Sequence, residues 1–361
     1  MPAPSVPFTA TRCAGNRFAI KYRAMPTKQR LGTPEKRRVI IDTDPGIDDA
    51  VALFLAMRSP ELQIDAITTV AGNKPLDMTL SNALRVVEIA GRSDIPVAAG
   101  ASGPLVRRLV TSTEAHGENG LGDVEFPEPK LKPHPQTAVQ LIRRFARESP
   151  GEISIITLGP LTNLALAFRE EPNLPSLIRD ITMMGGSVSG GNMTPAAEFN
   201  FYVDPEAASV VFRSGAPITM VGLDVTRRTL LHDEQIRALE LASDAAGRAA
   251  GQMTRAIRNR YRALGKTGGP VMHDALAVAA FLDSSLVTLQ EFHIEVETTG
   301  EFTAGETLGY RRPPVRRSPA MSSTEDAEIE SRFRTNAKVA VDLDVDRFVE
   351  LLIGRLGGQQ D

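Results

Sequence analysis

From residue 38 onward, short apolar segments alternate with stretches of helical periodicity, and this alternation constrains the fold more than any other feature. Residues 153–156 are the clearest case, a largely apolar run typical of a strand buried on both faces of a parallel sheet. The alternation predicts a single-domain α/β fold with a doubly wound, mostly parallel, Rossmann-like sheet and helices on both faces. The other predicted strands are 39–41, 64–70, 181–184, 218–221 and 292–296, and the predicted helices are 50–57, 80–90 and 163–168.

No break in this pattern divides residues 38–353, which we expect to form the one folded domain. Residues 233–263 have a helical pattern and are expected to add a small helical cap. Residues 310–330, rich in Arg and Pro, predict a mobile loop, and residues 354–361 a short tail. Residues 1–37 predict a disordered extension, because the first 33 carry six Lys or Arg, no acidic residue and no apolar stretch of a secretion signal. A transit peptide is the alternative for this segment.

Composition limits the class of partner. A formal net charge of −3 over 361 residues gives no overall basic field for nucleic acid, so we expect a small-molecule substrate. No apolar run approaches the ~18–20 residues that a membrane span needs. Cys13 is the only cysteine, so no intramolecular disulfide can form. A reducing compartment fits this usage, and we expect a cytoplasmic protein.

An acidic segment follows the first predicted strand and is the most informative motif. Asp42, Asp44, Asp48 and Asp49 fall within eight residues, DTDPGIDD. The carboxyl ends of strands in an open α/β sheet are where ligands bind. Capping of the next helix explains one or two acids, since its dipole favours negative charge there. Four converging carboxylates repel one another unless a cation compensates, and a hard divalent ion such as Ca²⁺ or Mg²⁺ is the natural partner.

Further polar clusters stand at the ends of other predicted strands. Taken singly, each has an ordinary explanation, such as a glycine turn or a helix N-terminal acid. Taken together, they bring amides and carboxylates to one edge of the sheet, which suits a polyhydroxylated ligand. The clusters are residues 70–73, 116–120 in a Gly-rich loop, 158–163, 184–186, Asn192, 197–200 and 272–275.

The motifs DTDPGIDDA, TTVAGN, GPLTN, AEFN and HDA, spread in this order from Asp42 to Ala275, closely resemble the inosine–uridine-preferring nucleoside hydrolase family. The resemblance covers residues 38 to 352. It implies a metal-dependent enzyme of nucleoside catabolism and purine or pyrimidine salvage, which uses metal-activated water to cleave ribonucleosides into ribose and free base. It also implies a homo-oligomer, either a dimer or a tetramer.

Carried over residue by residue, the resemblance assigns a role to each matching position. It implies one Ca²⁺ per subunit, bound by Asp44, Asp49, Asp274 and the carbonyl of Leu158. The ribose hydroxyls would contact the ion and its ligand Asp274, and would bond to Asp48, Asn73, Asn192, Glu198 and Asn200. Met184 and Phe199 would line the sugar, and His116 and Tyr261 would lie near the base. Asp44 would act as general base toward water, and His273 would protonate the leaving base.

Two other functions remain open on the sequence. Asp42-x-Asp44 after a strand also resembles phosphatases of the haloacid dehalogenase kind, although Pro45-Gly46 and two further aspartates depart from that pattern. A non-catalytic protein that binds nucleosides or Ca²⁺ is the second alternative. Within the hydrolase family, His273 argues against the purine-specific group, which lacks this histidine and stacks the base between tryptophans; this chain has no Trp. The sequence does not fix the base preference.

Overall fold

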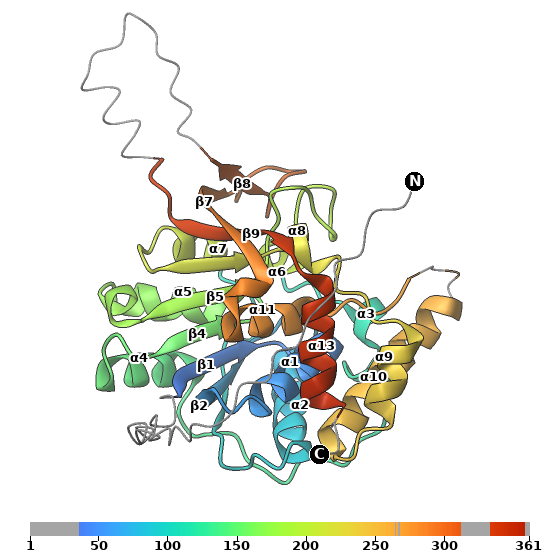
Figure 1. Cartoon of the computed structure of the whole chain (residues 1–361). Helices are drawn as coiled ribbons and strands as arrows, with labels where there is room; N and C mark the ends of the chain where they lie inside the picture. Colours follow the sequence, from blue (N-terminus) through green and yellow to red (C-terminus); the bar gives the residue numbers. More distant parts are fainter. Residues whose placement is uncertain (1–35, 264, 266–267, 312–332, 358–361) are drawn as a thin grey trace, which may run out of the picture. The chain divides into compact units, whose positions relative to one another are not determined.

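The computed structural model describes residues 36–263, 265, 268–311 and 333–357 (Figure 1). Its core is a nine-stranded sheet in the order β3-β2-β1-β4-β5-β6-β9-β7-β8. The strands from β3 to β9 in this order run parallel, whereas β7 is antiparallel to both β9 and β8. The strands are β1 Arg37–Thr43, β2 Leu62–Thr69, β3 Val97–Ala99, β4 Ser154–Thr157, β5 Asp180–Met184, β6 Ile218–Val221, β7 Val287–Val296, β8 Thr307–Tyr310 and β9 Ala337–Leu343.

Helices cover both faces of the sheet, as the alternating pattern predicts. On one face, α1 (Ile47–Met57), α11 (His273–Leu282) and α13 (Val345–Leu356) pack into one apolar core. On the other face, α4 (Ala138–Glu148), α5 (Thr162–Glu170) and α7 (Pro205–Phe212) pack into a second core. Every residue of β4 is buried, because this strand lies between the two cores, which explains its apolar sequence. The remaining α-helices are α2 Leu76–Ile89, α3 Thr113–His116, α6 Phe199–Val203, α8 Leu223–Thr226, α9 Asp233–Glu240 and α10 Ala245–Ala263, with 3₁₀ turns at Leu174–Leu177 and Ser284–Leu286.

The strand order places a ligand site at the carboxyl ends of β1 and β4. The chain runs outward from β1 through β2 to β3, and then returns to β4 on the other side of β1. The loops after β1 and β4 therefore leave in opposite directions and open a crevice at this switch point. The acidic segment follows β1 directly, and residues 158–163 follow β4.

All six strands predicted from the sequence are present. The helices that follow β1 and β4 begin close to the predicted positions. The segment 292–296 belongs to a longer strand, β7, which is antiparallel to its neighbours. The strands β3, β8 and β9 were not predicted, and two of them have only three and four residues.

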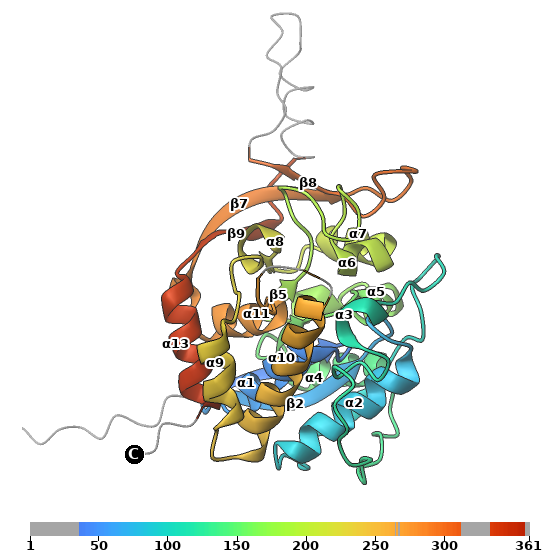
Figure 2. The ribbon, with the colours of Figure 1, turned by 90° about the vertical axis from the view of Figure 1, so that its right-hand side faces the viewer.

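The predicted helical segment 233–263 forms α9 and α10. These helices pack on each other, and α10 also contacts α1 and α2 (Figure 2). The C-terminal end of α10 reaches the carboxyl edge of the sheet, where it contributes to the site described below. No helix in the described part of the chain is both long and apolar enough to span a membrane. The described residues exclude 1–35 of the predicted extension 1–37, 312–330 of the predicted loop 310–330 and 358–361 of the predicted tail 354–361. Arg37 begins β1, Tyr310 ends β8, and residues 354–356 belong to α13.

Candidate active site

A pocket of about 190 Å³ lies at the carboxyl ends of the parallel strands. Two larger hollows, of about 530 and 590 Å³, lie elsewhere, and neither contains converging carboxylates of the acidic segment. Of the residues expected to form the site, only Asp44 and Asp49 are absent from the pocket lining, and both are fully buried. The expected residues that line the pocket are Asp48, Asn73, His116, Leu158, Met184, Asn192, Glu198, Phe199, Asn200, Tyr261, His273 and Asp274.

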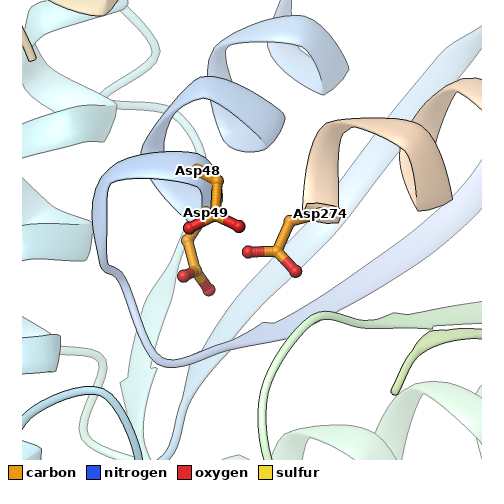
Figure 3. Close-up of side chains that lie close together, drawn as sticks. All are labelled: Asp48, Asp49 and Asp274. Carbon is orange, nitrogen blue, oxygen red and sulfur yellow. The ribbon is translucent and has the colours of Figure 1, made fainter. Parts of the chain in front are cut away.

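Three carboxylates meet at one end of this pocket. Oxygen atoms of Asp48, Asp49 and Asp274 all lie within 4.8 Å of one another (Figure 3). Asp48 and Asp49 stand in the first turn of α1, and Asp274 stands in the first turn of α11. Two helix N-termini therefore point their dipoles at the cluster and reduce the repulsion between its charges. Asp48, expected to contact ribose hydroxyls, belongs to this carboxylate cluster as well.

The Asp49 carboxylate is held by the loop that joins β1 to α1. Its Oδ1 accepts hydrogen bonds from Thr43 Oγ1 at 2.6 Å and from the Asp44 amide at 3.2 Å. Its Oδ2 accepts from the Gly46 amide at 3.0 Å and from Asn73 Nδ2 at 3.1 Å. These four donors fix the position of the Asp49 carboxylate.

Asp44 lies in a space formed by two glycines. A Cβ at Gly72 would come 2.1 Å from its Oδ2, and a Cβ at Gly159 would come 2.4 Å from its Oδ1. Oδ2 accepts a hydrogen bond of 2.6 Å from the Asn73 amide. Oδ1 is buried and has no hydrogen-bond partner among the described residues. A buried carboxylate oxygen without a partner is costly, so this atom fits a site that supplies a cation.

The electrostatics of the cluster also fit a bound cation. Burial, together with the charge of Asp49, raises the pKa of Asp44 well above its usual value and that of Asp48 to about 7. Burial and the neighbouring aspartates likewise raise the pKa of Asp274 well above its usual value. A divalent ion would neutralise this repulsion, and the donors are the hard oxygens that such ions prefer.

Asp42, the fourth acid of the segment, does not join the cluster. Its Oδ1 accepts hydrogen bonds from Thr68 Oγ1 at 2.5 Å and from Asn163 Nδ2 at 2.8 Å. It lies within β1, in register with Thr157 of β4, and its carboxylate links β1 to β2 and to the first turn of α5. The interpretation of all four acids as one converging group is therefore wrong for Asp42, and Asp274 takes its place.

The next part of the pocket carries amides and a buried carboxylate. Glu198 caps α6 and accepts hydrogen bonds from the amides of Gly186, Asn200 and Phe201. Burial raises the pKa of Glu198 to about 7. Asn200 Nδ2 donates to the carbonyl oxygens of Leu158, at 2.8 Å, and of Met184, at 3.1 Å. Asn192, on an exposed loop, accepts from the Phe199 amide at 3.0 Å. These groups can receive the hydroxyls of a sugar.

Two histidines and a tyrosine occupy the rest of the lining. His116, the first residue of the predicted Gly-rich loop 116–120, ends the short helix α3, and its Nδ1 accepts a hydrogen bond of 3.1 Å from the Ile47 amide. Nδ1 of His273 lies 2.8 Å from Thr226 Oγ1. Burial lowers the pKa of each histidine to about 4, so each is neutral near pH 7. Burial and the charge of Asp48 raise the pKa of Tyr261.

Sequence reasoning missed four residues that line the pocket: Ser112, Ala115, Ile257 and Val271. Ile257 precedes Tyr261 by one helical turn on α10, so the helical period could have indicated it. Ser112 and Ala115 lie close to His116 in the chain. Nothing in the sequence around Val271 indicates its place.

Comparison with known proteins gives a consistent answer. The family model of the inosine–uridine preferring nucleoside hydrolases matches residues 39–350. The chain is 41% identical over 320 residues to the pyrimidine-specific ribonucleoside hydrolase RihA of Citrobacter koseri. This match covers 88% of this chain and 97% of that protein. It is 44% identical over 274 residues to RihA of Photobacterium profundum, covering 75% of this chain and 88% of that protein.

Solved structures agree with the sequence relatives. A plant nucleoside hydrolase, the PpNRh1 enzyme, superposes with a TM-score of 0.82 at 34% identity, over 90% of this chain and 99% of that one. The purine-preferring ribonucleoside hydrolase of Gardnerella vaginalis gives 0.79 at 32% identity, over 89% and 98%. The comparisons do not favour the phosphatase or the non-catalytic binding protein. The chain therefore belongs to the metal-dependent inosine–uridine preferring nucleoside hydrolase family, and it is an N-glycosyl hydrolase that cleaves ribonucleosides into ribose and free base.

Proposed function

We propose that the ion of this enzyme is Ca²⁺, one per subunit, held by Asp44, Asp49, Asp274 and the carbonyl oxygen of Leu158. Three features support the proposal: an all-oxygen donor set, carboxylates of α1 and α11 within 4.8 Å, and the unpartnered Oδ1 of Asp44. When bound, such an ion lowers the pKa of a water molecule and so makes it a better nucleophile at neutral pH.

In the proposed reaction, the oxygen of water bonds to C1′ of the ribose while the bond from C1′ to the base nitrogen breaks. Asp44 accepts the proton that water releases. The electron pair of the broken bond leaves with the base. C1′ passes through an oxocarbenium-like state, and the carboxylates of Asp48 and Glu198 hold the ribose hydroxyls and stabilise its positive charge.

The leaving base requires a proton, and we assign its delivery to His273. Nδ1 of this residue is engaged by Thr226, which leaves Nε2 for the pocket. His116 accepts the Ile47 amide with Nδ1, so in the neutral ring Nε2 carries the hydrogen and can donate to the base. Tyr261 also lines the pocket. The meeting of these two histidines with the carboxylate cluster in one pocket is the observation that carries the proposed mechanism.

We further propose that uridine and cytidine are preferred over purine ribonucleosides. The relatives named pyrimidine-specific support this preference, since they match at 40–44% identity over most of the chain. The absence of tryptophan also supports it, because no indole is available to stack against a purine.

The remaining expectations concern the setting of the enzyme. We propose that residues 38–353 form the catalytic domain and that the enzyme assembles as a dimer or tetramer of this chain, acting on small nucleosides alone. We propose the cytoplasm as its location, because a single cysteine suits a reducing compartment.

A reducing-sugar assay over uridine, cytidine, inosine, adenosine, guanosine and 2′-deoxyuridine tests the preference. We expect kcat/KM to be highest for uridine and cytidine. A lower kcat/KM is expected for 2′-deoxyuridine, because its sugar lacks the 2′-hydroxyl that the polar groups of the pocket would bind. A higher kcat/KM for inosine than for uridine contradicts the pyrimidine preference while leaving the hydrolase activity in place.

The role of His273 is tested with two leaving groups. Uracil needs a proton, so His273→Ala should slow uridine cleavage by ~10²–10⁴-fold, the usual range for general acid catalysis. A nitrophenyl riboside carries a leaving group that departs without a proton and should be cleaved almost normally. Equal losses on both substrates contradict the acid role.

A further inference from the structure

The short helix α8 lies between the sugar side of the pocket and the start of α11. Its first residue, Leu223, donates its amide to the Gly186 carbonyl at 3.0 Å. Asp224 accepts hydrogen bonds from Ser187 Oγ at 3.2 Å and from the Val188 amide at 3.1 Å. One end of α8 is thus tied to the loop that leads to Asn192.

The last residue of α8 is tied to the opposite side of the pocket. Thr226 is fully buried, and its Oγ1 lies 2.8 Å from Nδ1 of His273. Among the described residues, this is the one hydrogen bond of the His273 ring, and the residue lines the pocket. The two positions are 47 residues apart in the sequence, which explains why no sequence motif connects them.

A second contact fixes Thr226 relative to the chain that enters α11. The Thr226 carbonyl accepts a hydrogen bond of 2.7 Å from Thr229 Oγ1. Thr229 Oγ1 in turn accepts from the Met272 amide at 3.1 Å. A β-bridge between Leu230 and Val271 holds the two segments side by side. Thr226 and His273 therefore move as parts of one hydrogen-bonded unit.

We propose that Thr226 is the positioning residue of His273 in ribonucleoside hydrolysis: its hydroxyl holds Nδ1 and so directs Nε2 toward the leaving base. This inference rests on the acid role proposed for His273 above. Thr226 is not itself a catalytic residue, because it does not line the pocket.

A hydroxyl suits this task better than other side chains. Once the ring has taken up a proton, its Nδ1–H can donate to this oxygen while its Nε2 proton goes to the base, which leaves a neutral ring with its hydrogen on Nδ1. After rotation, the same hydroxyl can donate to Nδ1 of a neutral ring whose hydrogen is on Nε2. A carboxylate could only accept, so it could not bond to this second form of the ring. Thr226 thus orients the ring in either protonation state.

The test uses Thr226→Val, which keeps the shape of the side chain and removes the hydroxyl, and Thr226→Ser, which keeps the hydroxyl. Thr226→Ala replaces the valine variant if the added methyl group disturbs packing. We expect Thr226→Val to lower kcat for uridine by about 10–100-fold, the usual effect of losing an orienting partner, with little change in KM. The nitrophenyl riboside should be cleaved almost normally, and Thr226→Ser should restore uridine cleavage to near the native rate.

Asp224→Ala is the matched control on the same helix. It releases the loop of Ser187 and Val188 on the sugar side and leaves the bond to His273 in place. We expect it to raise KM for uridine and for the nitrophenyl riboside alike. If Asp224→Ala produced the same leaving-group selectivity as Thr226→Val, general loosening of α8 would explain both, and the inference would be overturned.

Combination with His273→Ala separates this inference from the acid role. The double variant Thr226→Val/His273→Ala should be no slower on uridine than His273→Ala alone, because Thr226 acts through the ring. A selective loss in His273→Ala with none in Thr226→Val rejects the positioning role and leaves the acid role intact. Equal losses on both substrates in His273→Ala reject both.

Discussion

The carboxylate of Asp44 occupies the space that a side chain at Gly72 would fill. A Cβ built on Gly72 would lie 2.1 Å from Asp44 Oδ2, well inside contact distance. Gly72 has no unusual backbone torsion, so its value lies in this close approach rather than in turn formation. The motif TTVAGN thus combines a glycine that leaves room for the Asp44 carboxylate with Asn73, whose amide donates a hydrogen bond of 2.6 Å to that carboxylate.

Gly72→Ala should displace the Asp44 carboxylate and lower kcat/KM for ribonucleosides by about 100-fold or more, as a catalytic group moved by 1 Å commonly does. The added Cβ would also come 2.8 Å from Pro160 Cδ, so the circular dichroism spectrum must show that the variant keeps the native fold. Gly103→Ala is the matched control, since a Cβ there meets no atom within 4 Å. Circular dichroism and steady-state kinetics of both variants check this prediction. Native kinetics in Gly72→Ala would show that Asp44 tolerates displacement.

A similar contact joins Gly46 to His116, 70 residues later in the chain. A Cβ at Gly46 would lie 2.5 Å from His116 Nδ1 and 2.7 Å from Cε1. Gly46→Ala should therefore push the ring out of the pocket and break its bond to the Ile47 amide. We expect a loss of kcat/KM similar to that of His116→Ala, and no further loss when the two are combined.

The control for this pair is Gly354→Ala, at a position of α13 with no neighbouring atom within 4 Å. Measuring kcat/KM for uridine compares the four variants, namely the two single variants, their combination and this control, with the native enzyme. Additive losses in the double variant would mean that Gly46→Ala disturbs something other than His116, such as the loop that holds Asp49.

Metal binding is best tested at Asp274. Asp49 accepts four hydrogen bonds from its own loop and from Asn73, so removing its carboxylate would disturb the loop as well as the ion. Asp274→Asn keeps the size of the side chain and removes one charge. We expect the half-saturating Ca²⁺ concentration to rise by about 10-fold or more, both in activity and in the Ca²⁺-dependent rise of the melting temperature.

Asp94→Asn, an exposed aspartate paired with Arg92, is the control and should leave both titrations unchanged. Full activity of the native enzyme after removal of all divalent ions would contradict a metal role altogether. An unchanged Ca²⁺ titration in Asp274→Asn would contradict only the assignment of this ligand.

The sequence alone predicts the central strands and the acid cluster because both are local patterns. β1, β4, β5 and β6 are largely buried and therefore apolar, and Asp48 and Asp49 follow β1 directly. Asp42 was misjudged because its partners, Thr68 and Asn163, come from other elements. The Gly46–His116 and Thr226–His273 contacts were not predicted for the same reason. Such pairs depend on the packing of helices and loops, which no short-range spacing records.

The two pocket histidines should make the free energy of unfolding depend on pH in the acid range. Burial lowers the pKa of His116 and His273 from 6.5 to about 4 in the folded protein. In the unfolded chain they bind protons near pH 6.5, so between pH 6.5 and 4 the unfolded state holds more protons than the folded state. The free energy of unfolding must therefore fall as pH falls through this window, by up to about 1.4 kcal/mol per pH unit for each histidine. Above pH 6.5 both are neutral in either state, and the effect vanishes.

Urea unfolding at pH 7 and pH 5 measures this contribution in the native enzyme and in the double variant His116→Gln/His273→Gln. Buried carboxylates such as Glu198, whose pKa is raised to about 7, act in the opposite direction, because the folded state then holds the extra proton. The difference between the two proteins isolates the histidines, since the carboxylates are common to both. The double variant should lose less stability than the native enzyme on going to pH 5, whereas His232→Gln, at an exposed position, should behave as the native enzyme does. Equal losses in the native enzyme and the double variant would mean that the two buried histidines do not account for the loss of stability in acid.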